Sequence, residues 1–439
     1  MKPMNNPYID LRNKIINKKS KIAVIGLGYV GLPLAVEFGK LGFTVFGIDV
    51  DADRVSKVKS LVSYISDVDL KDLTSVVKRG KLIPSTDFSL LKEADVILIC
   101  VPTPLKSKYR PDISFIIQAV KKIKKNLHPA QLIILESTTY PETTDKVILP
   151  LLESGGLRHG RDFYLAFSPE RIDPGNKNFP LRKIPKVIGG INKEAAGLAA
   201  IVYGNIIEKV VVVSSSRTAE TVKLFENTFR ILNIALVDEM AMMAHKMGID
   251  IWEVIEAAKT KPFGFMPFYP GPGVGGHCIP KDPLYLYWKA KHHGFASRLI
   301  KTASDIINYM PQYVVERLRE ILAKQGKALS SSKILILGVT YKKDVKDLRK
   351  SPAIEIIEIL QRHNADIVYH DPLIPYLKLG HLNFKSIDLN KKNLNRFDCV
   401  VIAADHTLPN YKFILKNCRA IFDTRNVYKN VKNNKIHRL

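Results

Sequence analysis

The feature that most constrains the fold of this chain is a glycine-rich turn that directly follows a short apolar run near its start. The run Lys21-Ile-Ala-Val-Ile leads into Gly26-Leu-Gly-Tyr-Val-Gly31, which has the spacing GxGxxG. The pattern predicts a buried strand, a helix from about Val30 to Leu41, and a second strand over Thr44–Asp49. Asp49 stands 18 residues after Gly31. Strand, glycine turn, helix and closing acidic residue together predict a dinucleotide-binding βαβ unit.

Each part of this turn has a physical task. Glycines let the backbone turn tightly and approach a pyrophosphate closely, and the helix N-terminus stabilises the phosphate charge. Asp49 is expected to accept hydrogen bonds from the adenosine ribose hydroxyls and to repel a 2′-phosphate. The turn therefore predicts NAD rather than NADP, with a purely structural glycine turn as the alternative.

The next two-thirds of the chain change from an α/β pattern to a helical one. Strands over Asp95–Val101 and Gln131–Leu135 alternate with helices, so a doubly wound domain is expected up to about residue 213. Helical periodicity follows over Ala219–Met247 and Ser297–Lys324, with a bend expected near Pro311. This middle section is predicted to be all-helical.

The C-terminal part restarts the strand–helix alternation at Lys333–Gly338. Ser351 and Pro352 are a suitable N-cap and first-turn pair for the helix that follows. Later strands are predicted at 365–369, 399–403 and 420–423. The fold class is therefore α/β, with two Rossmann-like doubly wound parallel sheets joined by a central helical domain. We divide the chain into an N-terminal basic arm (1–20), a first α/β domain (21–213), a central helical domain (214–328) and a second α/β domain (329–439).

Composition restricts the classes of function. The net charge of +25 would suit nucleic acid or small polyanions, but the basic residues are spread along the chain and lack an aromatic platform. A lysine-rich surface is favoured, and no nucleic-acid partner is expected. The first twenty residues contain no signal-peptide core, and no run reaches the ~18 apolar residues of a membrane helix. A cytoplasmic protein without a membrane partner is predicted.

The four cysteines are too scattered for a disulfide framework or a zinc site. Cys100 and Cys399 lie in apolar strands and are predicted to be buried and inert. Cys278 instead lies in the glycine-rich stretch Gly271–Asp282, where it is a candidate nucleophile with Lys281 nearby to favour its thiolate. His277 is interpreted as a substrate or loop contact, with a Cys–His pair as the alternative. No metal site is expected.

Other candidate residues follow strands or share a helix face. Glu136-Ser-Thr138 ends a strand, and Glu170 lies within Ser168–Gly175, where acid/base catalysis and an ion pair with Arg171 are both open. Lys223 and Asn227 are four apart on a helix, so they either stabilise an oxyanion or form a surface pair.

The second α/β unit lacks the glycine fingerprint. It carries Tyr341-Lys-Lys-Asp344 and Arg349 in its place. Cationic side chains at such a turn indicate either a nucleotide- or phosphate-binding site or solvated surface lysines, and both interpretations stay open on the pattern alone.

Taken in series, these motifs resemble the UDP-sugar 6-dehydrogenase family, NAD-dependent enzymes that oxidise a nucleotide sugar to its uronic acid. The resemblance runs from Lys21 to Val427. It includes the fingerprint and the cysteine loop, and further motifs at 101–104, 136–138, 169–171, 223–227, 341–344 and 422–425. It implies that 21–213 binds NAD, that 214–328 carries the catalytic cysteine loop and mediates homodimerisation, and that 329–439 binds UDP.

The resemblance also implies a catalytic role for each candidate. Cys278 is the nucleophile, and Lys223 and Asn227 stabilise the oxyanion. Asp282 supports acid/base chemistry, while Glu170 and Thr138 handle the water that hydrolyses a thioester.

The resemblance further implies two sets of binding residues. The cofactor contacts are expected at Gly26, Gly28, Tyr29, Val30, Gly31, Asp49, Arg54, Pro102, Thr103, Thr138, Lys281 and Arg349. The substrate contacts are expected at Glu170, Arg171, Lys223, Asn227, Phe268, Tyr269, Gly275, His277, Lys342 and Arg425.

Such an enzyme removes two hydrides from a primary alcohol, first to a thiohemiacetal on Cys278 and then to a thioester that water cleaves. His277 stands where the glucose-oxidising branch has serine, so the loop resembles the branch acting on UDP-N-acetylhexosamines. The segment Ile279–Leu286 favours UDP-N-acetylglucosamine, with the manno and galacto epimers and UDP-glucose as alternatives. The product is expected to supply surface polysaccharide synthesis. A two-electron dehydrogenase or epimerase, and a nucleotide- or nucleic-acid-binding protein without chemistry, are the competing hypotheses.

Overall fold

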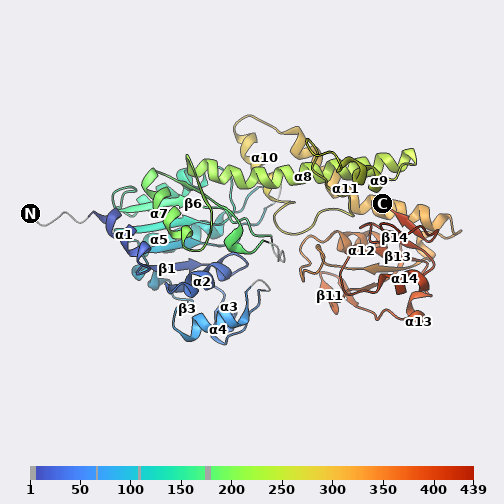
Figure 1. The fold of residues 1–439 in the computed structure, drawn as a ribbon, viewed down its shortest axis with the longest axis horizontal. Coiled ribbons are helices and arrows are strands. Elements are labelled where there is room, and N and C mark those ends of the chain that lie inside the picture. The colour runs from blue at the N-terminus through green and yellow to red at the C-terminus, as the bar shows by residue number, and fades with distance from the viewer. Residues whose placement is uncertain (1–5, 66–67, 107–109, 174–178) are drawn as a thin grey trace, which may run out of the picture. The chain divides into compact units, whose positions relative to one another are not determined.

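The computed structural model describes residues 6–65, 68–106, 110–173 and 179–439. Residues 1–5 of the predicted arm, and Pro174 and Gly175 of the Ser168–Gly175 motif, lie outside them. The chain forms two compact units (Figure 1). The first comprises Met1–Glu226 and Leu284–Phe295, and the second comprises Asn227–Pro283 and Ala296–Leu439. Each unit is described by itself below.

The first unit is built on an eight-stranded sheet with the order β3-β2-β1-β4-β5-β6-β7-β8. Its strands are β1 (Lys21–Ile25), β2 (Thr44–Ile48), β3 (Leu82–Ser85), β4 (Val96–Ile99), β5 (Gln131–Leu135), β6 (Phe163–Phe167), β7 (Lys186–Gly190) and β8 (Val210–Val213). All neighbours pair in parallel except β6 and β7, which are antiparallel. The predicted doubly wound domain is confirmed.

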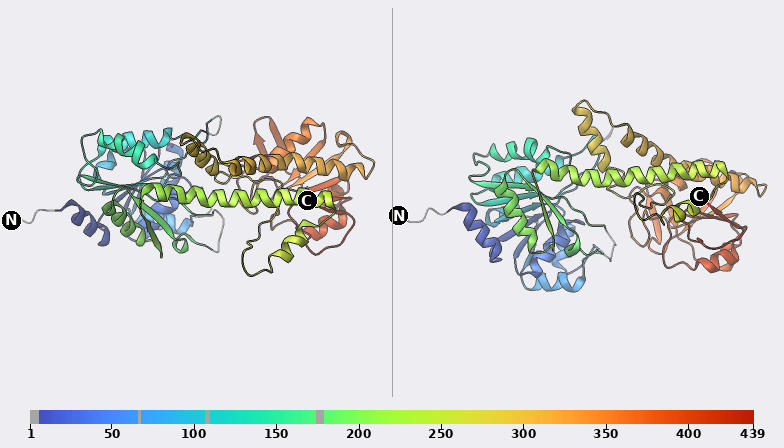
Figure 2. Two further views of the ribbon diagram at one scale, coloured as in Figure 1. Left: turned by 90° about the horizontal axis from the view of Figure 1, so that it is seen from above. Right: turned by 45° about the horizontal axis from the view of Figure 1, so that its top comes forward.

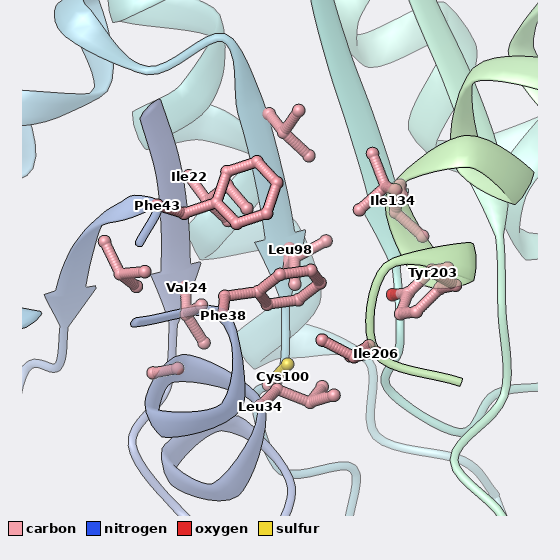
Figure 3. Close-up of a cluster of buried hydrophobic side chains, with 14 of the residues drawn as sticks. Ile22, Val24, Leu34, Phe38, Phe43, Leu98, Cys100, Ile134, Tyr203 and Ile206 are labelled. Carbon is pink, nitrogen blue, oxygen red and sulfur yellow. The ribbon is translucent and has the colours of Figure 1, made fainter. Parts of the chain in front are cut away.

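Helices cover both faces of this sheet (Figure 2). One face is covered by α1 (Pro7–Ile16), α2 (Gly31–Lys40), α4 (Leu70–Lys78) and α7 (Lys193–Gly204), and the other by α5 (Ser114–Asn126) and α6 (Leu149–Glu153). Strand residues alternate between the two cores: Ile22 and Val24 face α2, whereas Ala23 and Ile25 face the opposite side. Figure 3 shows the first core, with Cys100 and Tyr203 among its buried side chains.

Shorter elements complete the first unit. Helix α3 (Ala52–Lys59) follows β2, a 3-10 turn (Phe88–Glu93) precedes β4, and a π turn (Thr144–Ile148) leads into α6. Another 3-10 turn covers Leu181–Lys183. Residues 6–20 include α1, whose Leu11 and Ile15 are buried and whose Lys14 pairs with Asp95 at 2.7 Å.

The middle of the chain is helical, as predicted. It contains α8 (Ser216–Met247), α9 (Ile251–Ala258), α10 (Asp282–His292) and α11 (Arg298–Ala323). Helix α8 contains the boundary between the units at residue 226, and α11 continues through Pro311.

The second unit contains a five-stranded parallel sheet with the order β10-β9-β13-β14-β15. Its strands are β9 (Lys333–Leu337), β10 (Asp366–His370), β13 (Cys399–Ile402), β14 (Ile421–Asp423) and β15 (Ile436–Arg438), and a separate hairpin joins β11 (Tyr376–Leu379) and β12 (Leu382–Lys385). Helices α11 and α12 (Pro352–Arg362) pack on one face, and α13 (Lys391–Leu394) and α14 (Tyr411–Asn417) lie on the other. A 3-10 turn covers Leu329–Ser331.

One local prediction needs correction. Ser351 occupies the N-cap position of α12, and Pro352 begins the helix, as expected. The Ser351 side chain nevertheless makes no capping hydrogen bond, and its buried Oγ has no partner among the described residues. The fixed φ of Pro352, rather than a serine cap, therefore sets the start of α12.

Candidate active site

Gly26 and Gly31 are required by the packing of the first turn. Gly26 has a φ of 97°, and a Cβ on it would lie 2.5 Å from the carbonyl oxygen of Cys100. A Cβ on Gly31 would lie 1.8 Å from the carbonyl oxygen of Gly26. Backbone atoms at these distances leave no room for a side chain. The turn and the start of α2 can therefore approach β4 only because these two residues are glycines.

Gly28 differs from these two glycines because its surroundings are open. No atom lies within 4 Å of the position that its Cβ would take. Val30 caps α2 without a side-chain hydrogen bond, and the Tyr29 side chain is 46% exposed. Open space over a glycine turn at a helix N-terminus fits a pyrophosphate.

Asp49 is fixed at the carboxyl end of β2. Its Oδ2 accepts a hydrogen bond from the backbone N of Leu27 at 2.7 Å, and its Oδ1 accepts one from Asp51 N at 2.9 Å. Arg54 Nη1 lies 3.4 Å from Oδ2. A carboxylate held beside the turn is suited to ribose hydroxyls, so this edge of the sheet fits a dinucleotide.

The loops after β4 and β5 carry further predicted contacts. Pro102 is exposed, Thr103 is buried, and Thr138 is half-buried. The Tyr285 hydroxyl of α10 donates to the carbonyl oxygens of Thr103 and Pro104. Within the first unit, the part of α10 (Asp282–His292) that carries Tyr285 therefore holds the loop after β4.

Glu170 is 9% exposed, and the backbone of the two residues that follow it orients its carboxylate. Its Oε1 accepts hydrogen bonds from Arg171 N and Ile172 N, both at 2.6 Å. Its Oε2 lies 3.6 Å from Nζ of Lys186, a residue that the sequence analysis did not single out.

The proposed alternative of an ion pair between Glu170 and Arg171 is wrong. Arg171 Nη2 pairs with Oε1 of Glu226 at 2.6 Å, and its Nη1 donates to the carbonyl oxygen of Pro185 at 2.6 Å. The guanidinium therefore contacts Glu226 of α8 and the residue before β7.

Lys223 and Asn227 are both buried on α8, with 9% and 8% exposed, which contradicts the surface-pair alternative. Lys223 belongs to the first unit and Asn227 to the second. Asn227 Nδ2 donates to Oδ2 of the fully buried Asp282 at 2.7 Å. The second unit thus joins two predicted catalytic residues that are 55 positions apart in sequence.

The cysteine loop ends in a turn that begins at Cys278. Its carbonyl oxygen accepts hydrogen bonds from Lys281 N at 3.1 Å and Asp282 N at 2.8 Å, and its side chain is exposed. Cys100, Cys399 and Cys418 are buried, as expected for the first two. Cys278 is therefore the accessible thiol among the four.

The glycines of this loop serve close packing within the second unit. A Cβ on Gly275 would lie 2.5 Å from Cβ of Tyr341, and a Cβ on Gly276, whose φ is 86°, would lie 2.8 Å from the Tyr341 ring. Gly276 N donates to the carbonyl oxygen of Arg349 at 2.8 Å. The cysteine loop is thus seated on the loop that carries Tyr341 and Lys342.

His277 lies against Lys281, whose Nζ is 3.1 Å from the ring Nδ1. Burial lowers the pKa of His277 to about 4, and the charges of Lys281 and Arg349 act in the same direction. The imidazole is therefore neutral near pH 7, which agrees with a contact role in the loop.

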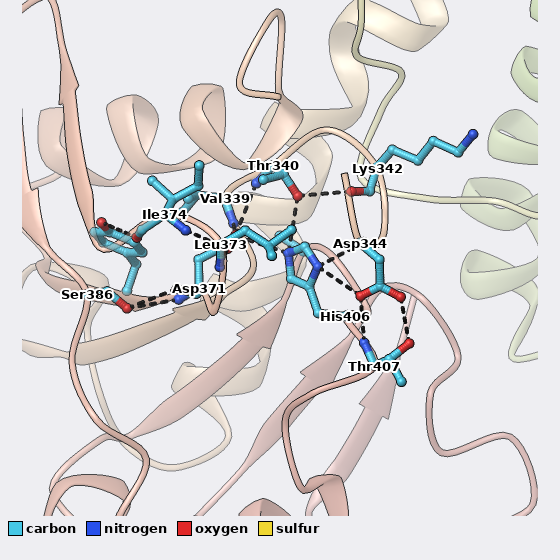
Figure 4. A network of polar contacts seen from close by, with 12 residues as sticks. Val339, Thr340, Lys342, Asp344, Asp371, Leu373, Ile374, Ser386, His406 and Thr407 are labelled. Atoms are coloured by element: carbon cyan, nitrogen blue, oxygen red, sulfur yellow. Dashed lines mark hydrogen bonds and ion pairs between the residues drawn. The ribbon is translucent and has the colours of Figure 1, made fainter. Parts of the chain in front are cut away.

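The loop carrying Lys342 is held by two residues that the sequence analysis missed, Asp371 and His406 (Figure 4). Asp371 follows β10, and its Oδ2 accepts a hydrogen bond from Val339 N at 2.7 Å. Asp49 accepts the equivalent hydrogen bond from Leu27 N in the first unit. In both α/β units, an aspartate after the second strand therefore holds the turn after the first strand. A signal was present, because Asp371 lies just beyond the predicted strand 365–369, and Asp49 ends the predicted strand Thr44–Asp49.

His406 fastens the far side of the same loop. Its Nδ1 lies 3.0 Å from Asp344 N, and its Nε2 lies 3.1 Å from Oδ2 of Asp371. Thr340 Oγ1 donates to the carbonyl oxygen of Lys342 at 3.0 Å. In Figure 4 the Lys342 side chain extends away from this network.

Arg425, which follows β14, is anchored by Nε donating to the Ala403 carbonyl oxygen at 2.9 Å. Gly271 N, at the start of the cysteine loop, donates to Oδ1 of Asp238 at 3.0 Å. Burial raises the pKa of Asp238 to about 8, against the opposing effects of Gly271 N–H and the Arg425 charge. Asp238 thus fastens the beginning of the cysteine loop on the side of Arg425.

The other predicted contacts of the second unit have local partners. The Phe268 ring meets Phe229 edge-on at 6.0 Å. Tyr269 stacks on Trp252 at 6.2 Å and donates its hydroxyl to Glu256 at 3.0 Å. Arg349 makes a two-point contact with Asp347.

Comparison with known sequences identifies the chain through all of its domains. The NAD binding domain of the UDP-glucose/GDP-mannose dehydrogenase family matches residues 20–207, its central domain matches 217–309, and its UDP binding domain matches 335–430. The chain belongs to the UDP-glucose/GDP-mannose dehydrogenase family. It is an NAD-dependent UDP-sugar dehydrogenase, and the predicted family is confirmed.

Individual relatives of this dehydrogenase carry different sugar names. The UDP-N-acetyl-D-mannosamine dehydrogenase of Pyrococcus horikoshii is 37% identical over 93% of this chain and 96% of the relative. The UDP-N-acetyl-D-glucosamine 6-dehydrogenase of Pseudomonas aeruginosa is 36% identical over 89% of this chain and 91% of the relative. A solved structure of UDP-D-ManNAc dehydrogenase from Pyrococcus horikoshii superposes with a TM-score of 0.87 at 36% identity, covering 95% of this chain and 98% of the other.

Two further observations concern the described part of the chain. None of its helices combines the length and apolar character needed to cross a membrane. Its His, Cys, Asp and Glu side chains form no group of three or more that could hold a metal ion, within those same residues.

Proposed function

We propose that this dehydrogenase carries out the four-electron oxidation of a UDP-N-acetylhexosamine to its uronic acid through a covalent intermediate on Cys278. The observation that carries the proposal is an exposed thiol at the end of a glycine-packed loop, four residues before Asp282, which pairs with Asn227. A two-electron dehydrogenase or epimerase has no need of a nucleophilic cysteine.

In the proposed reaction, NAD held at the glycine turn and Asp49 would supply the hydride acceptor for both oxidations. Asp282 receives the proton of the C6 hydroxyl, and the Cys278 sulfur adds to the resulting aldehyde to give a thiohemiacetal. Lys223 and Asn227 donate hydrogen bonds to the oxygen as it becomes negative. Oxidation of the thiohemiacetal leaves a thioester, which a water oriented by Glu170 and Thr138 cleaves to carboxylate and thiol.

The same proposal assigns the binding residues. Gly26, Gly28, Gly31 and Asp49 would hold the dinucleotide, with the turn contacting the pyrophosphate and the carboxylate contacting the ribose. Lys342 and Arg425 would pair with the charged UDP group, because their elements are anchored by the Asp371–His406 network and by Ala403. His277 and Gly275 would contact the sugar from the cysteine loop.

The sugar epimer is tested by a substrate panel. The loop sequence favours UDP-N-acetylglucosamine, whereas the Pyrococcus horikoshii relative favours UDP-N-acetylmannosamine. We propose to measure kcat/KM with both of these, UDP-N-acetylgalactosamine and UDP-glucose. A kcat/KM for an acetamido sugar at least about tenfold above that for UDP-glucose supports the proposal. A site that hydrogen-bonds the acetamido group discriminates against a substrate that lacks it. Preference for UDP-glucose would overturn it. The uronic acid product would be a glycosyl donor for surface polysaccharide synthesis.

We also propose that the enzyme is a homodimer formed through α8, whose exposed face bears a line of large apolar residues. These are Phe225, Phe229, Leu236, Met243 and Met247, of which Leu236 is 52% exposed. Their spacing of four and seven residues is that of a helix–helix seam. A second copy of this chain is the expected occupant, since the family resemblance implies dimerisation through the central helices.

Leu236→Glu is expected to convert the dimer to a monomer, because it places a charge in the centre of this apolar face. The measurement is molar mass by light scattering after gel filtration. Arg230→Glu, an exposed position on another face of α8, is the matched control and should remain dimeric. Equal masses for the two variants would contradict the proposed interface.

A further inference from the structure

The antiparallel strand β7 brings a lysine to the carboxyl edge of the parallel sheet in the first unit. Glu136 follows β5 and Glu170 follows β6, so both lie at this edge. Because β7 runs opposite to β6, its first residue, Lys186, lies beside them. Lys186 Nζ is 2.7 Å from Oε2 of Glu136 and 3.6 Å from Oε2 of Glu170.

This cluster is buried and well supplied with partners. The side chains of Lys186 and Glu136 are 4% and 0% exposed. Lys186 also donates to the Pro169 carbonyl oxygen at 3.1 Å, and its Nζ lies 4.9 Å from the centre of the Tyr203 ring. The Tyr203 hydroxyl donates to Oε1 of Glu136. A buried ammonium is retained only where charges and hydrogen bonds offset its desolvation.

The charges of the cluster follow from these contacts. Burial raises the pKa of Glu136 to about 7, against the opposing effect of the Lys186 charge. Burial acts to lower the pKa of Lys186, but the two carboxylates outweigh it and raise that pKa above its ordinary value. Lys186 is therefore positively charged throughout the neutral range.

Glu170 is held in a specific orientation relative to this charge. Its Oε1 is occupied by two backbone N–H groups. Its buried Oε2 accepts no hydrogen bond among the described residues, although it faces Lys186. One oxygen of the carboxylate is thus fixed by the backbone, and the other is left to a further donor.

We propose that Lys186 is a positioning residue for thioester hydrolysis: its buried ammonium, 3.6 Å from Oε2 of Glu170, holds that oxygen in the direction of the attacking water. This inference rests on the proposed function, in which Glu170 handles that water. In the step, the water oxygen bonds to the thioester carbonyl carbon and its proton passes to Oε2 of Glu170. The carbon–sulfur bond breaks, and the electron pair leaves with the Cys278 sulfur. No oxidant or reductant is needed.

The test uses variants that separate this role from a structural one. Lys186→Met alone leaves two buried carboxylates without a counter-ion and is expected to lose stability. The pair Lys186→Met with Glu136→Gln removes one positive and one negative charge together, so its melting temperature is expected to stay near that of the wild type. Glu136→Gln alone is the matched control, because it keeps the ammonium beside Glu170.

We expect the double variant to complete both oxidations but to hydrolyse the thioester slowly. In rapid mixing with the best UDP-N-acetylhexosamine, the double variant should form two NADH per active site at the wild-type rate. It should then turn over at least about tenfold more slowly, because a carboxylate that is no longer held in place loses the orientation that proton transfer from the water requires. Intact mass spectrometry should detect a uronyl adduct on Cys278.

The separation between burst and turnover supplies a readout that a purely structural role would not give. A general loss of structure slows both phases together, whereas a displaced Glu170 slows hydrolysis alone, and Glu136→Gln should keep both phases at the wild-type rate.

Three outcomes would contradict the inference. They are hydrolysis at the control rate, a burst slowed as much as hydrolysis, and loss of the melting transition in the double variant. If the wild type itself forms no NADH with any UDP-N-acetylhexosamine, the proposed function fails, and this inference fails with it.

Discussion

Replacing Cys278 with alanine is expected to lower NADH formation from the UDP-sugar by at least roughly 10³-fold, since removal of a catalytic nucleophile costs this much or more. Cys278 is the exposed thiol of the chain, whereas the other three cysteines are buried. NAD binding should remain, because the glycine turn and Asp49 belong to the first unit and Cys278 to the second. The measurements are steady-state NADH formation and calorimetric titration with NAD.

Cys418→Ala is the matched control for this variant. Cys418 is buried in the second unit near Ile414, so its replacement tests the loss of a thiol without touching the cysteine loop. The control is expected to retain turnover. Full activity in Cys278→Ala would exclude the covalent mechanism, and loss of NAD binding in that variant would show that the substitution acts on the fold.

Gly31→Ala is expected to abolish NAD binding and to destabilise the first unit. Its added Cβ would lie 1.8 Å from the Gly26 carbonyl oxygen, and backbone cannot yield at that distance without rebuilding the turn. Overpacking of this kind costs about 1–3 kcal/mol or more. The melting temperature and the NAD dissociation constant are the two quantities to measure.

Gly28→Ala separates the two effects, because no atom lies within 4 Å of its added Cβ. This variant should keep the wild-type melting temperature and still bind NAD at least about tenfold more weakly, because a methyl group would occupy the space of the pyrophosphate. Gly204→Ala, at the end of α7 and equally open, should change neither quantity. Unchanged NAD affinity in Gly28→Ala would contradict the proposed cofactor position.

Much of the architecture was readable from local pattern. The runs that became β1, β5 and β9 are short, apolar and followed by glycine or polar residues, and they were predicted within one residue of their observed ends. Helix α8 was predicted from uninterrupted periodicity. The residues within these elements determine their structure, so the sequence alone is enough to predict them.

Other elements depend on contacts that sequence cannot show. Strand β7 was missed because Lys186-Val-Ile-Gly-Gly190 begins with a lysine, which is usually a surface residue. Only the antiparallel pairing with β6, and the two carboxylates that meet it there, make a buried lysine stable. Similarly, an ion pair of Arg171 with Glu170 was one of two open interpretations, but the partner of Arg171 is Glu226, 55 residues away.

The candidate site divides in the same way. Cys278, Asp49 and the fingerprint glycines carry their chemistry in local motifs, so they could be named in advance. The pairing of Asn227 with Asp282 and the support of Lys342 by His406 join residues from distant segments. Asp371 was the exception, because it repeats the strand-end position of Asp49 and could have been predicted by analogy.

The most direct test of the account is the amount of NADH formed when a limiting UDP-N-acetylhexosamine is consumed completely in excess NAD. The proposed thioester mechanism predicts two NADH for each sugar, together with a uronic acid as the product. One NADH for each sugar, with an aldehyde or ketone product, would contradict the account.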